Sequence, residues 1–439
     1  MDPENLYARL PLFAQKMMVN LQGRRIAQRR YDYAFARILA DAERTGALQG
    51  MALRDFQAQQ ITRHFHHAAQ SGLWAARFHS YGVAIKSGDP FTELAKLPVI
   101  TKSEIIDHTA GLVPQPFKRG RLIPCHTSGS TGSGLKFKVT PEAEKKQYAV
   151  WWRYRSWHGI DLDTWCAYFG GRSIVPLRQK KPPYWRVNRP GKQILFSAYH
   201  LNADTAADYI SALHEHAPAW IHGYPSMLAV LAGFIRDHRL PRVNSLRMIT
   251  TGAESLLPHQ RALLESVFNV PVFDHYGQAE AVANISQCEN STYHVDEDFS
   301  YVEFLPVETE PGLFRVVGTN WTNPAFPLFR YDTGDHVRLA DVTCSCHRPG
   351  RIVTCIDGRQ EDYVTLPNGV KLGRLDHIFK DMTQIREAQI HQPDTDRVIL
   401  RVVKAAGYSD STEKELLRQA RKRLGEEINI GIEYRSVLP

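Results

Sequence analysis

The sequence has few cysteines, no long apolar run and no block of like charge. Six cysteines in 439 residues do not form a disulfide framework, so the thiols remain free for metal binding or buried positions. No apolar stretch approaches the roughly 20 residues that cross a bilayer. The opening residues 1–30 also lack the pattern of a secretory signal. We therefore expect a cytoplasmic protein without a membrane segment.

The charge balance is positive, with 54 Lys and Arg against 46 Asp and Glu and a net charge of +8. A polyanionic partner such as nucleic acid is one interpretation of this excess. The basic residues are scattered among acidic ones, however, and no nucleic-acid-binding motif is present. We expect no nucleic-acid partner, and the positive balance also suits an enzyme that handles ATP and anionic substrates.

The pattern of apolar residues predicts an α/β protein. Residues from about Tyr31 to His79 have helix-like spacing, so we expect a helical lead-in over residues 1–100, with a loop from Phe91 and a helix beginning at Thr101. Further on, short β-branched runs alternate with amphipathic stretches, which favours parallel strands joined by helices. The clearest of these segments are 206–215, 220–221, 227–238 and 247–251.

The last third of the chain changes character twice. Between Tyr293 and Ile356, short strands separated by Gly, Pro and Asn predict a small antiparallel, barrel-like sheet. After Gly358 a strand, an Asn-Gly turn, a further strand and a helix over 412–427 predict a small α/β domain. We expect a large N-terminal domain of residues 1–360, with mixed parallel sheets and the barrel-like sheet, and a small C-terminal domain of residues 361–439.

A loop rich in glycine and hydroxyl groups runs from Thr127 to Gly134 and is followed by Lys136 and Lys138. Inward-pointing backbone N–H groups, hydroxyls and lysines suit a polyphosphate. The loop is not a Walker loop, because Leu135 stands where that motif requires Lys. Taken alone, it also fits a flexible Gly/Ser linker.

Three further motifs accompany this loop: Asp274–Glu280 (DHYGQAE) after an apolar run, Tyr331–Asp335 (YDTGD), and 358–362 (GRQED). Their order and spacing resemble the adenylate-forming superfamily of acyl-CoA ligases, adenylation domains and luciferases. The segments Ser197–Leu201, His222–Ser226 and Pro327–Tyr331 further resemble the phenylacetate–CoA ligase family, particularly its CapK-type members. The resemblance extends from about Leu97 to Asp362.

The resemblance implies roles for named residues. The triphosphate would bind Thr127, Ser128, Gly129, Ser130, Thr131 and Gly132. Adenine would lie among Gly252, Ala253, Glu254, His275, Tyr276 and Gly277, while Asp335 would bind the ribose hydroxyls. The catalytic groups would be Glu280, which would hold Mg²⁺, together with Lys136, Thr131 and Arg359.

The implied reaction is attack of a carboxylate on the α-phosphorus of Mg·ATP, in which positioning and electrostatics provide most of the catalysis. An acyl-adenylate would form and pass to coenzyme A or the thiol of a carrier protein. The pocket for the acid, which we expect to be aromatic, would contain Tyr199, His200, His222, Gly223 and Tyr224. The two histidines fit a structural, hydrogen-bonded role equally well.

A second group of residues has the composition of a metal site. Cys288, His294, Cys344 and Cys346 supply four ligands of the kind that Zn²⁺ takes tetrahedrally, although Cys-x-Cys is a weak motif and His347 is an alternative ligand. The resemblance implies the same role, because similar cysteines and a histidine bind zinc in some members of the family. We interpret Cys166 and Cys355 as buried apolar residues, and Cys125 as leading into the phosphate loop.

Two positions depart from the family pattern. Relatives usually carry a C-terminal lysine that reaches the α-phosphate, and this sequence stops at Pro439, where that segment would begin. Glu361 occupies the position of the hinge about which the small domain of relatives rotates, so we expect a mobile C-terminal domain. Alternative functions therefore stay open: transfer to an amine or hydroxyl, activation of an inorganic oxyanion such as nitrite, or nucleotide binding without catalysis.

Overall fold

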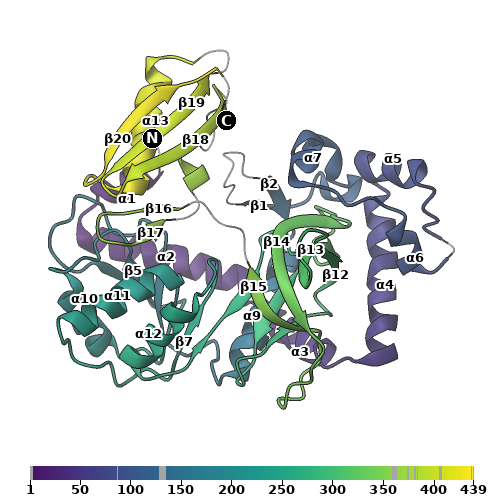
Figure 1. The fold of residues 1–439 in the computed structure, drawn as a ribbon, viewed down its shortest axis with the longest axis horizontal. Coiled ribbons are helices and arrows are strands. Elements are labelled where there is room, and N and C mark those ends of the chain that lie inside the picture. Colours follow the sequence, from purple (N-terminus) through teal and green to yellow (C-terminus); the bar gives the residue numbers. More distant parts are fainter. Residues whose placement is uncertain are drawn as a thin grey trace.

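The computed structural model describes residues 3–86, 88–127, 135–357, 363–372, 375–379, 382, 384–404, 408–436 and 438. It confirms the α/β fold class. Figure 1 shows a helical N-terminal region, a sheet layer covered by α10, α11 and α12, a strongly curved antiparallel sheet around β13 and β14, and a small C-terminal unit above the first layer.

Helices make up most of the first part of the chain, from Pro3 to Phe117. Its helices are α1 (Pro3–Arg9), α2 (Leu12–Arg30), α3 (Phe35–Thr45), α4 (Gly50–Ala68), α5 (Gly72–Ser80), α6 (Pro90–Ala95), α7 (Lys102–Asp107), α8 (Thr109–Leu112) and the short η1 (Gln115–Phe117). Thr101 begins α7 through a capping box with Glu104, as predicted. The loop predicted from Phe91 is wrong over α6, where the Asp89 side chain caps the helix by accepting the Thr92 N–H.

A six-stranded sheet has the strand order β4-β5-β3-β6-β7-β8. Its strands are β3 (Cys166–Gly170), β4 (Trp185–Asn188), β5 (Gln193–Ser197), β6 (Trp220–Gly223), β7 (Met248–Thr251) and β8 (Val272–Phe273). All neighbours are parallel except β4 and β5. The helices beside it are α9 (Pro141–Trp157), α10 (Ala206–His216), α11 (Pro225–Asp237) and α12 (Pro258–Phe268).

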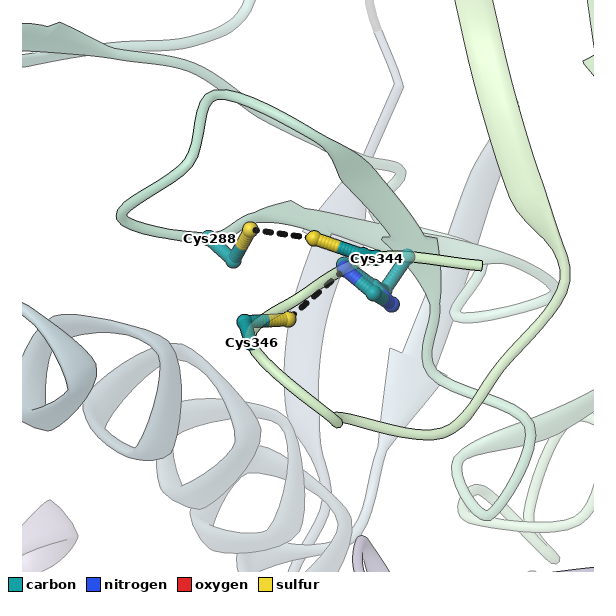
Figure 2. A group of neighbouring side chains, drawn as sticks. Cys288, Cys344 and Cys346 are labelled. Carbon is teal, nitrogen blue, oxygen red and sulfur yellow. Dashed lines mark hydrogen bonds between the residues drawn. The ribbon is translucent and has the colours of Figure 1, made fainter. Parts of the chain in front are cut away.

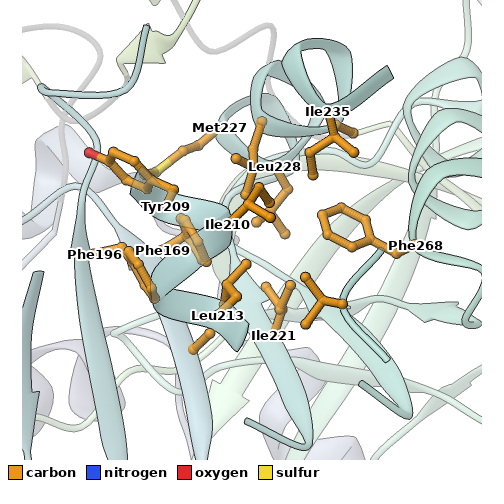
Figure 3. Packing of buried hydrophobic residues seen from close by; sticks show 14 of the residues in the cluster. Phe169, Phe196, Tyr209, Ile210, Leu213, Ile221, Met227, Leu228, Ile235 and Phe268 are labelled. Atoms are coloured by element: carbon orange, nitrogen blue, oxygen red, sulfur yellow. The ribbon is translucent and has the colours of Figure 1, made fainter. Parts of the chain in front are cut away.

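Apolar side chains from these strands and helices make the main core (Figure 3). Phe169 on β3 and Phe196 on β5 stack with ring centroids 4.5 Å apart, and neither is more than 1% exposed. Helices α10 and α11 close this side with Leu213 and Leu228, both fully buried. Burial on this scale fixes the strands and therefore the positions of the loops that follow them.

The second sheet is antiparallel and has the order β12-β13-β14-β15-β11-β10-β9. Its strands are β9 (His275–Gly277), β10 (Asn284–Gln287), β11 (Tyr293–Val295), β12 (Ser300–Pro306), β13 (Leu313–Asn320), β14 (Tyr331–Ala340) and β15 (Ile352–Asp357). The sequence predicted this sheet only from Tyr293 onward. A separate hairpin is formed by β1 (Ile123–His126) and β2 (Lys136–Val139).

The C-terminal region has a core of its own. Its elements are β16 (Val364–Thr365), β17 (Lys371–Leu372), η2 (Leu375–Ile378), β18 (Ile385–Asp394), β19 (Arg397–Lys404), α13 (Asp410–Leu424) and β20 (Asn429–Tyr434). Val398, Leu400, Leu416 and Leu424 are among the buried residues that pack together here. The expected boundary at residues 360–361 lies outside the described residues. Within the described part of the chain, no helix has the length and apolarity needed to span a membrane.

The main core gives a stability prediction. Phe169→Ala removes a fully buried ring and should lower the free energy of unfolding by about 3–5 kcal/mol, because the cavity it leaves is only partly refilled. The measurement is equilibrium denaturation of both proteins. Phe13→Ala is the matched control, because Phe13 is 72% exposed and its loss should change stability by less than about 0.5 kcal/mol. Equal destabilisation by both variants would contradict the assignment of the core.

Candidate functional site

Two predicted nucleotide segments follow neighbouring parallel strands. Thr250 on β7 pairs with Phe273 on β8, so both strands end at the same edge of the sheet. Parallel sheets bind ligands at this edge. Gly252 follows β7 so closely packed that a Cβ there would lie 3.3 Å from the His275 carbonyl oxygen. The next residue, Ala253, has a φ of +69°, in the left-handed region that residues other than glycine seldom adopt.

Tyr276 and Asp335 are brought together from β9 and β14. The Tyr276 hydroxyl donates to Asp335 Oδ2 at 2.6 Å, and the Gln278 side-chain amide contacts both groups. Burial, reinforced by the charge of Asp335, raises the pKa of Tyr276 well above its ordinary value near 10. Tyr276 therefore stays a hydrogen-bond donor to the carboxylate, and the predicted adenine and ribose residues form one polar pair.

Glu280 is a carboxylate that is only 7% exposed. Its Oε1 accepts a hydrogen bond from the Tyr331 hydroxyl at 3.2 Å, and its carbonyl accepts one from the Asn320 side chain at 2.9 Å. These bonds fix Glu280 from β13 and β14. Tyr331 belongs to the same motif as Asp335, but no pattern in the sequence indicates that its hydroxyl reaches Glu280.

The base of the predicted phosphate loop is closed by Thr127. Its backbone N–H donates to the Leu135 carbonyl at 2.9 Å, and its hydroxyl accepts the Leu135 N–H at 3.1 Å. Lys136 begins β2, in register with His126, and is exposed. The other predicted loop residues lie outside the described residues, as do Arg359 and the hinge residue Glu361; the loop residues are Ser128, Gly129, Ser130, Thr131 and Gly132.

Two half-buried histidines lie behind the turn at Gly252. His222 Nδ1 shares a hydrogen bond of 2.8 Å with the Thr250 hydroxyl, and a Cβ on Gly252 would lie 3.9 Å from His222 Cε1. Within the described residues, His275 Nε2 is buried without a hydrogen-bond partner. Burial, with the nearby Arg155 charge, lowers the pKa of both histidines to about 3. Both are therefore neutral near pH 7.

The other predicted pocket residues divide into two groups. Tyr199 and Tyr224 meet at Gly171: the Tyr199 hydroxyl donates to the Gly171 carbonyl at 3.3 Å, and a Cβ on Gly171 would lie 3.2 Å from Tyr224 Cε2. Gly223 packs against the backbone of β3 so tightly that a Cβ would lie 2.6 Å from a carbonyl oxygen.

His200, by contrast, is a buried structural neighbour of Ser197. Its Nδ1 lies 2.8 Å from the Ser197 hydroxyl, and its ring stacks on Tyr184 with centroids 5.2 Å apart. Burial lowers its pKa. These contacts fit the structural role that the sequence left open for this histidine.

The predicted thiol cluster is assembled as expected (Figure 2). Cys288 and His294 flank the turn between β10 and β11, while Cys344 and Cys346 lie in the loop between β14 and β15. The Sγ atoms of Cys288 and Cys344 are 3.7 Å apart, and Cys346 Sγ is 3.3 Å from His294 Nε2. All four ligand atoms lie within 4.8 Å of one another.

The donor set and its surroundings fit Zn²⁺. Tetrahedral ligands at Zn–S distances of about 2.3 Å are separated by about 3.8 Å, close to the spacing of Cys288 and Cys344. His294 Nδ1 lies 3.1 Å from the Pro349 carbonyl, a bond that leaves Nε2 facing the thiols. Burial raises the pKa of Cys288 to about 11. Burial also opposes ionisation of Cys344, but hydrogen bonds from its neighbours outweigh it and lower its pKa to about 5.

The remaining cysteines correct one prediction. Cys166 is buried at 3% exposure, as expected. Cys355 is exposed, so its interpretation as a buried residue is wrong. It lies on β15 at a break in the register with β14, where Arg338 pairs with Cys355 and the next residue, Leu339, pairs with Val353. This irregularity takes Cys355 off the buried face that Val353 occupies, whereas the apolar neighbours made the whole segment look buried. Cys125 is half-buried on β1, in the strand leading to the loop.

Comparisons with known proteins agree with this architecture. Residues 365–439 match the family model of the CapK C-terminal domain. The chain is similar to Protein CapK of Staphylococcus aureus, with 24% identity over 447 residues that cover 99% of this chain and 96% of the relative. Among solved structures, 2-hydroxyisobutyryl-CoA ligase in complex with 2-HIB-AMP and CoA has a TM-score of 0.58 at 18% identity, covering 90% of this chain and 89% of that one. An open conformation of that ligase has a TM-score of 0.54 at 17% identity, covering 90% and 91%. The chain therefore has the adenylate-forming ligase fold that its motifs predicted.

The lowered pKa values of His222 and His275 give a pH prediction. Their folded pKa lies below the unfolded value of about 6.5, so the unfolded chain binds more protons and stability falls as pH drops from about 6.5 towards 3. Each histidine should contribute about 1.4 kcal/mol per pH unit within this window. Denaturation at several pH values should show a slope smaller by about this amount in His275→Gln. Parallel curves for the variant and the wild type would contradict the neutral state of His275.

Proposed function

We propose, on the premise that the chain has this ligase fold, that it is an AMP-forming ligase that activates a carboxylic acid with ATP. The observation that carries this proposal is the hydrogen-bonded pair Tyr276 and Asp335 beside the close turn at Gly252. This edge of the parallel sheet offers a flat aromatic group for a base and a carboxylate for ribose hydroxyls. The carboxylate is already oriented by the tyrosine, so little order has to be gained on binding.

The nucleotide would lie along this edge. Adenine would contact Tyr276 and the turn Gly252–Glu254, with His275 and Gly277 alongside, and the ribose would bind Asp335 and Arg359. The phosphates would be held by the loop that Thr127 closes, with Thr131 and Lys136 assisting departure of pyrophosphate. Glu280 has the hard oxygen ligands that suit Mg²⁺, which characteristically binds one or two carboxylates together with substrate phosphates. When bound, Mg²⁺ would neutralise charge on the phosphates.

The acid would enter beside Tyr199 and Tyr224 and attack the α-phosphorus, with the new P–O bond forming as the bond to pyrophosphate breaks. No protein nucleophile is needed. The neutral His222 is well suited to this neighbourhood, because it adds no charge that would compete with Mg²⁺ for the substrate anion. The thiol of coenzyme A, or another thiol, would then attack the acyl-adenylate and displace AMP, which is a good leaving group.

The same proposal divides the chain at residues 360–361 into an adenylating domain and a small C-terminal domain, with Glu361 as hinge. The separate buried cluster of the C-terminal region supports this division. So does the family model, whose match begins at residue 365. Tyr199 packs against the C-terminal cluster, which puts a predicted pocket residue next to the smaller domain.

The thiol cluster would hold Zn²⁺ in a structural role. Cys288, His294, Cys344 and Cys346 fill all four tetrahedral positions, so no site is left for a substrate. Such an ion would join the β10–β11 turn to the loop before β15. An exposed ion pair between Arg348 and Glu289, 2.6 Å apart, links the same two segments.

Substrate-dependent exchange of pyrophosphate into ATP, measured across aryl, aliphatic and amino acids, tests the proposed half-reaction. Glu280→Gln should reduce exchange on the order of a hundredfold, because it removes a charge that acts on the triphosphate. Asp335→Asn should raise the KM for ATP about tenfold or more. Asp237→Asn is the control at an exposed site and should behave as wild type. Exchange that no acid stimulates, or that survives Glu280→Gln unchanged, would reject the proposal.

Elemental analysis of the purified protein should find one zinc ion per chain. Cys346→Ser should lose most of it, because the hydroxyl is a poor ligand for Zn²⁺ at neutral pH. Cys355→Ser is the matched control, since this exposed thiol lies outside the cluster. Equal zinc content in the two variants would assign the metal to another site, and wild-type protein without zinc would leave the cluster as a group of free thiols.

A further inference from the structure

One buried carboxylate stands where the chain passes from one sheet to the other. Strand β8 ends at Phe273 in the six-stranded sheet, and β9 begins at His275 in the seven-stranded sheet. Asp274 is the single residue between them and is 5% exposed. Its side chain has no part in the nucleotide contacts described above.

Asp274 is held from three other strands. Its Oδ1 accepts the Thr251 hydroxyl at 2.6 Å, and its Oδ2 accepts the Tyr293 hydroxyl at 2.9 Å. Its backbone N–H donates to Gln287 Oε1 at 2.9 Å, and its carbonyl accepts the Gln287 N–H at 3.3 Å. Gln287 is in turn bonded through Oε1 to the Arg261 guanidinium at 2.9 Å.

Each partner is the sequence neighbour of a residue with another role. Thr251 precedes the turn residue Gly252, and Asp274 itself precedes His275. Gln287 precedes the cluster residue Cys288, and Tyr293 precedes His294. Asp274 thus joins the ends of the two strands that would carry the nucleotide to both ends of the turn that carries two cluster ligands: its carboxylate contacts Thr251 and Tyr293, and its backbone contacts Gln287.

We propose that Asp274 is a positioning residue through which the thiol cluster holds the nucleotide-binding strand ends in place. The inference rests on the proposed function, from which it takes that these strand ends bind a nucleotide. The cluster fixes the β10–β11 turn, the turn fixes Gln287 and Tyr293, and these two residues fix Asp274. The neighbours of Asp274 along the chain, His275 and Tyr276, then keep their places against Gly252.

The physical reason is the cost of a buried carboxylate without donors. Burial raises the pKa of Asp274, against the opposing effect of the hydroxyls of Thr251 and Tyr293. Removal of one donor leaves an unsatisfied oxygen in the interior, so the surrounding backbone must move or admit water. A shift of this junction displaces both strand ends, and displacements of about 1 Å at a reactive site are costly.

Tyr293→Phe tests the proposal with a minimal change, because it removes one hydroxyl and leaves His294 in place. Hydrogen–deuterium exchange should become faster in residues 248–254 and 272–278. The Kd of an ATP analogue should rise roughly tenfold and the KM for ATP with it, while kcat changes less. Zinc content should stay at the wild-type value. Tyr209→Phe is the matched control, because it makes the same change at a different place and removes a buried hydroxyl that is bonded to the Ser197 carbonyl at 2.7 Å.

A double variant that combines Tyr293→Phe with Cys344→Ser tests whether the two residues act through one chain of contacts or independently of each other. Cys344→Ser should lose zinc and speed exchange in the same two segments, and adding Tyr293→Phe should increase exchange there by less than the sum of the single effects. Fully additive effects, or unchanged exchange at these segments in Tyr293→Phe, would overturn the proposal. Wild-type protein that binds no ATP analogue would instead refute the proposed function, and the exchange measurement would still decide the role of Asp274.

Discussion

The chain changes from a parallel sheet to an antiparallel one across a single residue, and this tight passage governs where the candidate nucleotide groups lie. Strands β7 and β8 run side by side and stop together. The chain then enters the second sheet without a loop, so Tyr276 is carried directly towards Asp335 on β14. If the connection were longer, the distance between Tyr276 and Asp335 would depend on the conformation of a loop.

Buried charge also ties the helical lead-in to this junction region. Arg153 on α9 forms ion pairs with Asp296 at 2.7 Å and Asp298 at 2.8 Å, and all three side chains are nearly inaccessible. The Thr45 hydroxyl at the end of α3 donates to Asp298 at 2.7 Å. Such a network is costly to break once formed, because each removed partner leaves a charge in the interior. It therefore specifies one arrangement of α3, α9 and the segment after β11.

Much of the fold followed from apolar periodicity. The alternation from Ala206 to Thr251 predicted α10, β6, α11 and β7 nearly to the residue, because each segment buries one side or both sides completely. Strands β9 and β10 were missed because they are short and contain His, Asn, Ser and Gln. Those polar side chains are stabilised by partners distant in sequence, such as the Asp296 carboxylate that accepts from Asn284 and Ser286. Periodicity carries no information about such partners.

The candidate site, like the fold, could be predicted from the sequence only in part. Motif order grouped Tyr276 with Asp335 and the four thiol-cluster residues with one another, and the structure brings each group together. The partners of Asp274 could not be predicted from the sequence, because Thr251 and Tyr293 belong to no shared pattern and come together only through strand pairing. The positions of residues 128–134 and 358–362 lie outside the described part of the chain, so their roles stay predictions.

The C-terminal region carries its own interior, formed by β18–β20 and α13. The family model of the CapK C-terminal domain covers this same region, residues 365–439. Tyr199 and Val230, which lie earlier in the chain, also pack against this interior, so a substitution at either position would reach the C-terminal region from outside it.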